Sequence, residues 1–358
     1  MGKNKRKMPD SVIIIMTLMI LAIGITMIMT SSSAFAINNT GNPYYFLIRQ
    51  ARLALVGVVA ATLALLTPYK WFRALAVPGV IAAGAALVLL FTPFAVFLNG
   101  ATRWIDFGIQ FQPSETAKVA LALFWAWWLA RRPVRRITQT VIPLAITAVF
   151  LGIIVKEPDL GTAFIIAAAC YLLLLQSELS AWWFAAAAPA GAAALVWIIR
   201  RNPYQERRIA GWLDPWEDPT GDGLQYVQTQ LAFARGELFG VGVGASEQKY
   251  RLPESYTDSI FAIVGEELGF FLTLMLVVFF VVLIFRCFYV ANKCQDDFGR
   301  FLAFGLTAML ALQVCVNMAV MTGLMPITGV TLPLVSYGGT SLIITMFSIG
   351  VILSVSRG

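Results

Sequence analysis

The chain is organised as ten long apolar runs separated by short segments that carry most of its charges, prolines and glycines. A transmembrane helix needs about 20 consecutive apolar residues. The 358 residues are 59% apolar and only 13% charged, whereas about a quarter of a soluble domain is charged. We therefore predict an all-α polytopic membrane protein with about ten transmembrane helices, and we exclude a soluble globule, a disordered chain and a single-pass anchored domain. The predicted spans are 11–29, 53–67, 75–91, 116–130, 138–155, 162–175, 182–199, 260–285, 301–322 and 342–356.

The first apolar run resembles a secretory signal, because basic residues precede it and Ala34-Phe35-Ala36 resembles a cleavage site. Its apolar core is too long for a cleaved signal, and nine more runs follow. We predict a retained first helix. The alanine-rich seventh run predicts close helix packing, because small residues let transmembrane helices approach one another.

The distribution of charge predicts the orientation. With the amino terminus inside, the inner segments hold 14 of the 26 basic residues and four of the 19 acidic residues. This bias follows the positive-inside rule, so both termini are predicted to be cytoplasmic. The net charge of +7 then reflects topology, and no nucleic-acid partner is expected. The inner basic residues are Lys3, Lys5, Arg6, Lys7, Lys70, Arg73, Arg131, Arg132, Arg135, Arg136, Arg286, Lys293, Arg300 and Arg357.

Residue types that are missing limit the chemistry. The chain has no histidine, which excludes Ser-His-Asp triads, HExxH zinc sites and histidine proton relays. Its four cysteines form no CxxC pair and are interpreted as buried free thiols. Any reaction must use carboxylates, amines, guanidinium groups, hydroxyls or a bound ion.

A long outer loop, residues 200–259, joins the seventh and eighth spans and carries seven basic and nine acidic residues. Long loops without regular structure are uncommon unless they are functional. Arg200, Arg201, Arg207 and Arg208 cluster at its start. They form either a solvated collar at the lipid headgroups or a clamp for a phosphate or pyrophosphate, whose geometry matches guanidinium. Residues 226–239 predict an interfacial helix.

Three acidic residues lie near the start of the eighth span. Asp258 immediately precedes it, where a carboxylate commonly caps a helix. Glu266 and Glu267 lie two turns deeper, where ionisable groups are costly. We expect these two to pair with Lys118 or Arg103.

Several separated motifs together resemble the SEDS family of peptidoglycan polymerases, which includes RodA, FtsW and SpoVE. The resemblance covers nearly the whole chain as a single membrane domain, 1–358, and is closer to the division and sporulation members. Three places depart from the family pattern: Tyr256 replaces the usual histidine, Ser259 replaces the usual aromatic residue, and ARGE at 234–237 replaces the usual glycine-rich turn. The motifs are RW at 103–104, QPSE at 112–115 with Lys118, EPDLGTA at 157–163, QK at 248–249, LPE at 252–254 with TD at 257–258, GEELG at 265–269, GVTLP at 329–333 and SYGGTS at 336–341.

This resemblance implies an inverting glycosyltransferase that polymerises lipid II at the outer face of the bacterial cytoplasmic membrane. Asp258 is the implied general base. The implied substrate-binding residues are Lys118, Arg103, Glu115, Asp159, Arg207, Arg208 and Ser336.

Among these residues the cations would stabilise the pyrophosphate leaving group, and Glu115 and Asp159 would order them or hold a divalent cation such as Mg or Mn. A class B penicillin-binding protein, a transpeptidase, is the implied partner, and the eighth and ninth spans are its predicted contact. Two alternatives stay open: a lipid II flippase and a non-catalytic scaffold of the cell-wall machinery. Charges at the outer ends of the spans favour the enzyme, because transporters place ionisable groups near the midplane.

Overall fold

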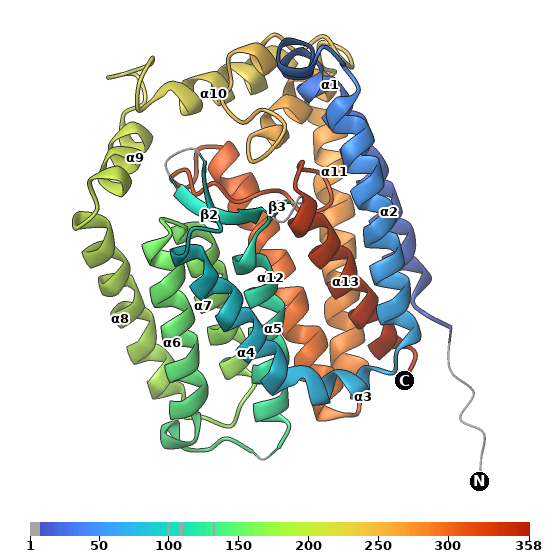
Figure 1. The fold of residues 1–358 in the computed structure, drawn as a ribbon, viewed down its shortest axis with the longest axis vertical. Coiled ribbons are helices and arrows are strands. Elements are labelled where there is room, and N and C mark those ends of the chain that lie inside the picture. Colours follow the sequence, from blue (N-terminus) through green and yellow to red (C-terminus); the bar gives the residue numbers. More distant parts are fainter. Residues whose placement is uncertain (1–7, 99–100, 107–109, 132) are drawn as a thin grey trace.

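All ten predicted spans correspond to helices in the computed structural model, which describes residues 8–98, 101–106, 110–131 and 133–358 (Figure 1). Lys3, Lys5, Arg6, Lys7 and Arg132 of the predicted inner charges lie outside the described residues. The first half contains α1 (Ser11–Thr40), α2 (Tyr45–Leu66), α3 (Tyr69–Phe72), α4 (Ala76–Val88), α5 (Pro113–Leu129), α6 (Val141–Lys156) and α7 (Leu160–Leu175). The second half contains α8 (Ala181–Arg200), α9 (Pro203–Leu213), α10 (Leu224–Gly236), α11 (Ile260–Lys293), α12 (Asp297–Met321) and α13 (Gly339–Ser356). Short 3₁₀ turns are η1 (Arg73–Leu75), η2 (Leu89–Phe91), η3 (Ile137–Thr140) and η4 (Gln248–Tyr250).

Within the described residues, eight helical stretches are long and apolar enough to cross a membrane. The two remaining predicted spans are α5 and α7, with 17 and 16 residues. Helix α5 is buried along nearly its whole length, and one side of α7 is buried against the bundle. A helix covered by protein on all sides need not match the bilayer thickness with its own apolar surface. The chain is a multi-pass membrane protein.

The two ends of the described chain meet at one end of the bundle (Figure 1). Asp10 caps α1 by accepting hydrogen bonds from the backbone N–H groups of Val12 and Ile13. Its backbone N–H donates to the hydroxyl of Ser356, 3.2 Å away, and its carboxylate pairs with Arg286 at 2.7 Å. The first and last spans therefore begin and end on the same side.

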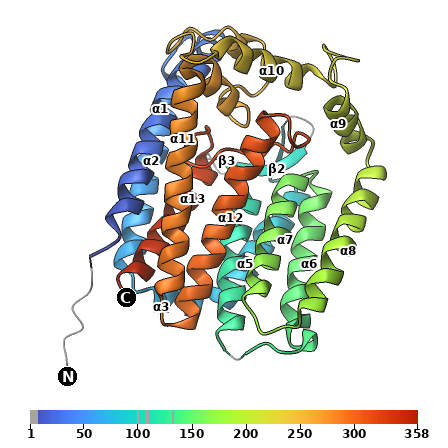
Figure 2. The same cartoon turned by 180° about the vertical axis from the view of Figure 1, so that it is seen from behind.

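The helices differ in how much of their surface is buried: some lie at the centre of the bundle and others at its edge. About 72% of the apolar window of α12 and 67% of that of α13 are buried. None of the residues of α8, all of which the structure describes, is buried. Figures 1 and 2 show α8 at the edge of the bundle. The predicted close packing of its alanine-rich stretch is therefore wrong within this single chain.

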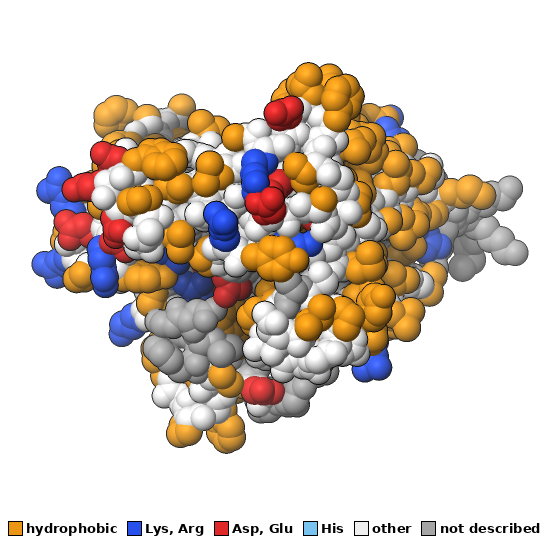
Figure 3. All heavy atoms as spheres, turned by 90° about the horizontal axis from the view of Figure 1, so that it is seen from above, with side chains coloured by type: hydrophobic (Ala, Val, Ile, Leu, Met, Phe, Trp, Pro, Cys, Tyr) orange, Lys and Arg blue, Asp and Glu red, His pale blue; other side chains and the backbone are white. Residues whose placement is uncertain are grey.

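The predicted long loop lies at the end of the bundle opposite the two termini and folds into α9, α10 and η4. Helix α10 lies across this end (Figure 1). A helix is confirmed over most of the predicted range 226–239: α10 spans Leu224–Gly236 and ends three residues earlier than predicted. Its interfacial position stays a prediction. Seen from this end, charged side chains gather mainly on the side of α9, whereas the side of α1 and α2 is mostly hydrophobic (Figure 3).

The sequence did not predict the small antiparallel sheet at this end. It consists of β1 (Ala95–Leu98), β2 (Ala101–Asp106) and β3 (Gln110–Phe111) in the order β1-β2-β3.

A non-helical segment, residues 323–338, joins α12 to α13, and its central residues 332–336 are buried. We call it the α12–α13 segment. Irregular backbone at the depth of a membrane is tolerated only where it is buried in protein or lines a cavity. Its backbone N–H and C=O groups must therefore form hydrogen bonds with the helices and loops around them. Several residues that make these bonds belong to the site described next.

Candidate active site

Asp258 lies between the outer loop and α11. The N-cap residue of α11 is Ser259, and no side-chain capping bond is found among the described residues. The predicted capping alternative for Asp258 is therefore wrong, and its carboxylate lies 3.5 Å from the hydroxyls of Thr257 and Ser259. Asn317 of α12 donates to the backbone carbonyl of Asp258 and to that of Val330, both at 2.8 Å. One amide thus ties the acidic residue to the α12–α13 segment.

Arg103 is placed by an irregularity in the sheet. Trp104 pairs with Val96, and Thr102 pairs with Phe97, so Arg103 has no partner in the register of β1 and β2. Such a bulge turns a side chain away from the regular alternation of a strand, and bulges are frequent beside active sites. The sequence carried no signal for this bulge.

One edge of the Arg103 guanidinium is hydrogen-bonded to backbone carbonyls, and the other edge faces the interior of the site. Its Nε donates to the carbonyl of Glu157 at 3.3 Å, and its Nη2 donates to that of Pro158. A Cβ atom added at Gly329 would lie 3.4 Å from Arg103 Nη1 and 3.9 Å from Asp258 Oδ2. Gly329 has φ +72°, a conformation that favours glycine. Both functional groups therefore border one small space that the absent side chain leaves open.

The charge state of Asp258 is set by its surroundings. Burial raises the pKa of Asp258 to about 6, and the negative charge of Glu254 adds to that rise. The positive charges of Arg208 and Arg103 act in the opposite direction and limit it. A carboxyl group with this pKa is largely ionised at neutral pH but remains basic enough to accept a proton.

Arg207 and Arg208 line a cavity of about 370 Å³ above the α12–α13 segment. Arg208 Nη1 donates to the carbonyl of Ile327 at 3.0 Å, and its guanidinium lies over the ring of Tyr204 at 4.6 Å. Asp222 and Pro253 contribute to the same wall. The arrangement offers two guanidinium groups, one fixed and one exposed, to an anion.

The predicted arginine cluster is divided between two surroundings. Arg201 lies over the ring of Trp197 of α8, 4.3 Å from its centroid. This contact is away from the cavity and agrees with the collar interpretation for that residue. The clamp interpretation applies to Arg207 and Arg208.

Asp159 and Glu157 lie in the turn between α6 and α7. Asp159 caps α7 by accepting from the backbone N–H of Thr162 at 3.1 Å. Glu157 is 1% exposed, and its carboxylate oxygens accept no hydrogen bond from any described residue. Burial and the charge of Asp159 raise the pKa of Glu157 to about 8, so it is mainly uncharged at neutral pH.

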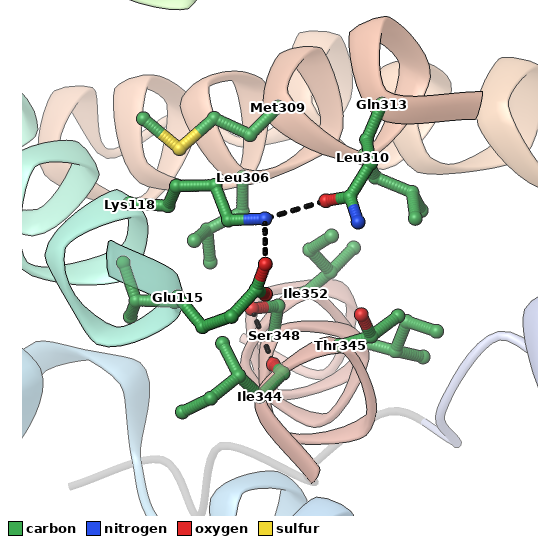
Figure 4. Close-up of a pocket in the computed structure, with 12 residues that line it drawn as sticks. Glu115, Lys118, Leu306, Met309, Leu310, Gln313, Ile344, Thr345, Ser348 and Ile352 are labelled. Atoms are coloured by element: carbon green, nitrogen blue, oxygen red, sulfur yellow. Dashed lines mark hydrogen bonds and ion pairs between the residues drawn. The ribbon is translucent and has the colours of Figure 1, made fainter. Parts of the chain in front are cut away.

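Glu115 and Lys118 form a buried pair inside the bundle (Figure 4). Lys118 Nζ lies 2.9 Å from Glu115 Oε1 and 2.6 Å from Gln313 Oε1. The three residues border a cavity of about 30 Å³, room for about one water molecule. Gln313 in turn donates to the carbonyl of Thr331 at 3.1 Å. This pair supports the α12–α13 segment from below.

Two predicted placements need correction. Glu266 does not pair with Lys118 or Arg103: it accepts from the hydroxyl of Ser246 and from the backbone N–H groups of Glu247 and Gln248. Its role is to anchor the outer loop to α11. Glu267, buried beside it, has neither cation among the partners found for it in the described residues.

Ser336 is predicted to bind substrate, and its hydroxyl accepts from the backbone N–H of Leu332 at 2.8 Å. This hydrogen bond closes a turn of the α12–α13 segment. It gives Ser336 a structural role that requires no ligand. Substrate binding by Ser336 stays a prediction.

Sequence reasoning missed Asn317 and Gln313. Their spacing of four residues puts both amides on one face of α12, and that face meets the α12–α13 segment. An amide pair at this spacing within an apolar helix was the available signal.

The acidic residues of the site do not come together as metal ligands. Among the described residues, no group of three or more Asp, Glu, Cys or His side chains is arranged to hold a metal ion. Glu115 is paired with Lys118, and Asp159 caps a helix. These residues do not form a complete protein ligand set, so we derive no step through a metal.

The fold and the site together define a polytopic membrane protein with an acidic and arginine-rich site at one membrane face. The chain belongs to the cell cycle protein family of FtsW, RodA and SpoVE, whose model matches residues 10–358. The resemblance to this family is therefore confirmed.

Comparison with individual proteins gives the same family. A probable peptidoglycan glycosyltransferase FtsW of Geobacter metallireducens is 38% identical over 97% of this chain and 94% of its own. Stage V sporulation protein E of Bacillus subtilis is 36% identical over 99% of this chain and 98% of its own. A solved chain from a peptidoglycan synthase complex that coordinates polymerization and crosslinking superposes with a TM-score of 0.79 at 29% identity, covering 98% of each chain.

Proposed function

We propose that this chain is a peptidoglycan glycosyltransferase that polymerises lipid II into β-1,4 glycan at the outer face of the bacterial cytoplasmic membrane. The observation that carries the proposal is the convergence of Asp258 and Arg103 on Gly329, beneath the cavity lined by Arg207 and Arg208. The names of the relatives support the same reaction.

Asp258 is the general base of this reaction. The donor sugar is α-linked to a polyprenyl pyrophosphate, and a β-linked product requires attack from the opposite face. The acceptor 4-hydroxyl attacks the anomeric carbon, Asp258 takes its proton, and the bond to the pyrophosphate breaks with its electron pair. A pKa of about 6 suits this task, because the carboxylate is ionised before the attack.

The leaving pyrophosphate gains negative charge and needs cations rather than an acid. Arg103, Arg207 and Arg208 supply them around the site, and guanidinium groups match phosphate oxygens in pairs. Lys118 is also predicted to bind the pyrophosphate, although Glu115 and Gln313 already engage its ammonium. Asp159 orders the turn whose carbonyls hold Arg103.

The proposed surroundings follow from the two ends of the molecule. With both termini cytoplasmic, α9, α10 and the site face outward (Figure 1). A class B penicillin-binding protein is the proposed partner. The exposed apolar face of α11 suits its single transmembrane helix better than α12, which is mostly buried.

The test is reconstitution of the purified chain in liposomes with fluorescent lipid II. We expect glycan strands that a muramidase degrades. Lipid II that crosses the bilayer without forming polymer would favour the flippase, and neither product with a partner present would favour the scaffold.

A further inference from the structure

Helix α11 changes character at Gly269. The backbone of Gly269 leaves the helical conformation, with φ 73° and ψ −178°. Before it, every residue from 260 to 266 is buried within the protein. After it, large apolar side chains face outward along one side, among them Phe270, Phe271, Leu274, Val278, Val281 and Phe285. In the chain without a partner, the surface of α11 that lipid can reach therefore begins at Phe270.

The length of this lower part matches a bilayer. The apolar stretch 270–285, which ends before Arg286, rises roughly 24 Å at 1.5 Å per residue, which is most of the hydrocarbon core of about 30 Å. Arg286, which pairs with Asp10 at 2.7 Å, follows at the inner interface. At the inner end, Lys293 lies over the ring of Tyr289 at 4.7 Å, and such basic and aromatic residues mark a membrane interface. Phe270 then lies at the outer boundary of the hydrocarbon.

The outer loop is bonded to α11 at this boundary. The backbone N–H groups of Val241 and Gly242 donate to the carbonyls of Glu266 and Glu267, at 3.0 and 3.1 Å. In the reverse direction, Phe270 N–H donates to the carbonyl of Glu237 at 2.9 Å. These bonds satisfy backbone groups that the break releases.

The approach is so close that a Cβ atom at Gly269 would lie 2.2 Å from the backbone nitrogen of Gly240. The loop and the break therefore lie at the same depth.

The side chains of this part of the loop are apolar and uncovered. Phe239 is 80% exposed, Val243 is 58% exposed, and Leu238 and Val241 are exposed as well. The ring of Phe239 lies 5.5 Å from that of Phe271, so the patch continues the outward apolar face of α11. We call residues 238–243 the apolar tip.

We propose that the apolar tip inserts into the outer leaflet of the lipid bilayer. Its depth, its apolar side chains and its continuity with the lipid-facing side of α11 all point to this occupant. Lys249, which donates to the carbonyl of Gly244 at 2.7 Å, lies beside the tip where an ammonium meets lipid phosphates.

Insertion of the apolar tip would fix the distance of Asp258 from the membrane surface. The helical residues between the break and Asp258 rise roughly 13 Å, and the tip is bonded to the break. The tip therefore keeps the proposed base at a constant distance from the membrane surface at which a polyprenyl-linked substrate is anchored. Membrane insertion itself does not depend on the proposed function.

The test is a spin label at Phe239→Cys in the full chain, in nanodiscs, with Cys294 and Cys315 replaced by serine. Collision with oxygen reports lipid, and collision with a water-soluble nickel complex reports solvent. Val281→Cys is the lipid control and the exposed Glu217→Cys is the water control. Val243→Cys provides a second label if the first variant fails to fold.

We expect labels at 239 and 243 to resemble the one at 281, with oxygen favoured over nickel by several-fold. Nickel accessibility like that at 217 would overturn the proposal, because the tip would lie in water. Protection from both reagents would overturn it too, because protein would then cover the tip.

Discussion

Arg103 and Asp258, which are 155 positions apart in the sequence, border the same space at Gly329, where an added Cβ would lie 3.4 Å from Arg103 Nη1 and 3.9 Å from Asp258 Oδ2. The arginine comes from a bulged strand, the aspartate from the loop before α11, and the glycine from the α12–α13 segment. This arrangement suits a reaction in which a carboxylate accepts a proton and a neighbouring guanidinium binds the leaving group.

Gly329→Ala should remove polymerisation while costing only modest stability. The added methyl group would occupy the space between Arg103 and Asp258. Holding an alanine at the positive φ of this position would cost on the order of 1 kcal/mol of stability. Gly323→Ala is a matched control, because Gly323 has φ +78° and nothing within 4 Å of an added Cβ. Melting temperature and glycan synthesis are measured on both variants. Equal activity losses would show that backbone strain, and not the filled space, is responsible.

Asn317→Leu should reduce both activity and stability. It leaves the buried carbonyls of Asp258 and Val330 without their donor, at a cost of about 1–3 kcal/mol for an unsatisfied group. Thr307→Val on the same helix is the control, because the Thr307 hydroxyl bonds only within α12 among the described residues. Denaturation and initial rates test this. Normal activity in Asn317→Leu would mean that Asp258 does not need this tether.

Polymerisation should depend on pH through Asp258. A base works only when deprotonated, so activity should be low below the pKa of about 6 and rise to a plateau above it. Glu254→Gln removes one cause of the raised pKa, so the inflection should move to lower pH, although burial, the larger cause, remains. Rates across pH 4.5–8.5 measure it. Glu247→Gln, an exposed partner of Arg235, should leave the inflection in place, and a shift upward in Glu254→Gln would contradict the assignment.

Lys118→Met should lower the melting temperature strongly, because it leaves Glu115 charged and buried without its partner. Breaking a buried pair costs about 3–5 kcal/mol, whereas replacing both members is often nearly neutral. The double variant Glu115→Gln with Lys118→Met should therefore recover most of the stability. Equal stability of the single and double variants would contradict the pair. Loss of polymerisation that persists in the stable double variant would show that the Glu115–Lys118 pair acts in the reaction and not only in stability.

The sequence predicted the helices well, because long apolar runs and the bias in basic residues are local signals. It also led to Asp258 and Arg103 through motifs that the family resemblance interprets, and to Arg208 through the cluster of arginines at the start of the long loop. The partners of charged residues were harder to predict. Glu266 was expected to meet a distant cation, whereas it accepts hydrogen bonds from the Ser246 hydroxyl and from the loop backbone at 247–248. The choice between these partners depends on tertiary contacts.

Residues that hold the site in place left weak signals. Arg103 is directed inward by a bulge, and no property of residues 95–106 marks the irregular register. Asn317 and Gln313 look like isolated amides until a buried, non-helical segment is known to cross their face of α12. The unpacked surface of α8 was not predictable either, because small residues favour packing without saying whether the partner helix belongs to the same chain.

The most direct measurement is glycan synthesis by Asp258→Asn together with its melting temperature. Asparagine keeps the shape of the side chain but cannot accept the proton, and general-base catalysis is worth on the order of 10²–10⁴ in rate. Polymerisation should fall to near background while the melting temperature stays close to that of the wild type, since the backbone carbonyl that Asn317 holds is unchanged. An Asp258→Asn protein that polymerises lipid II at the wild-type rate would contradict the assignment of Asp258 as the base.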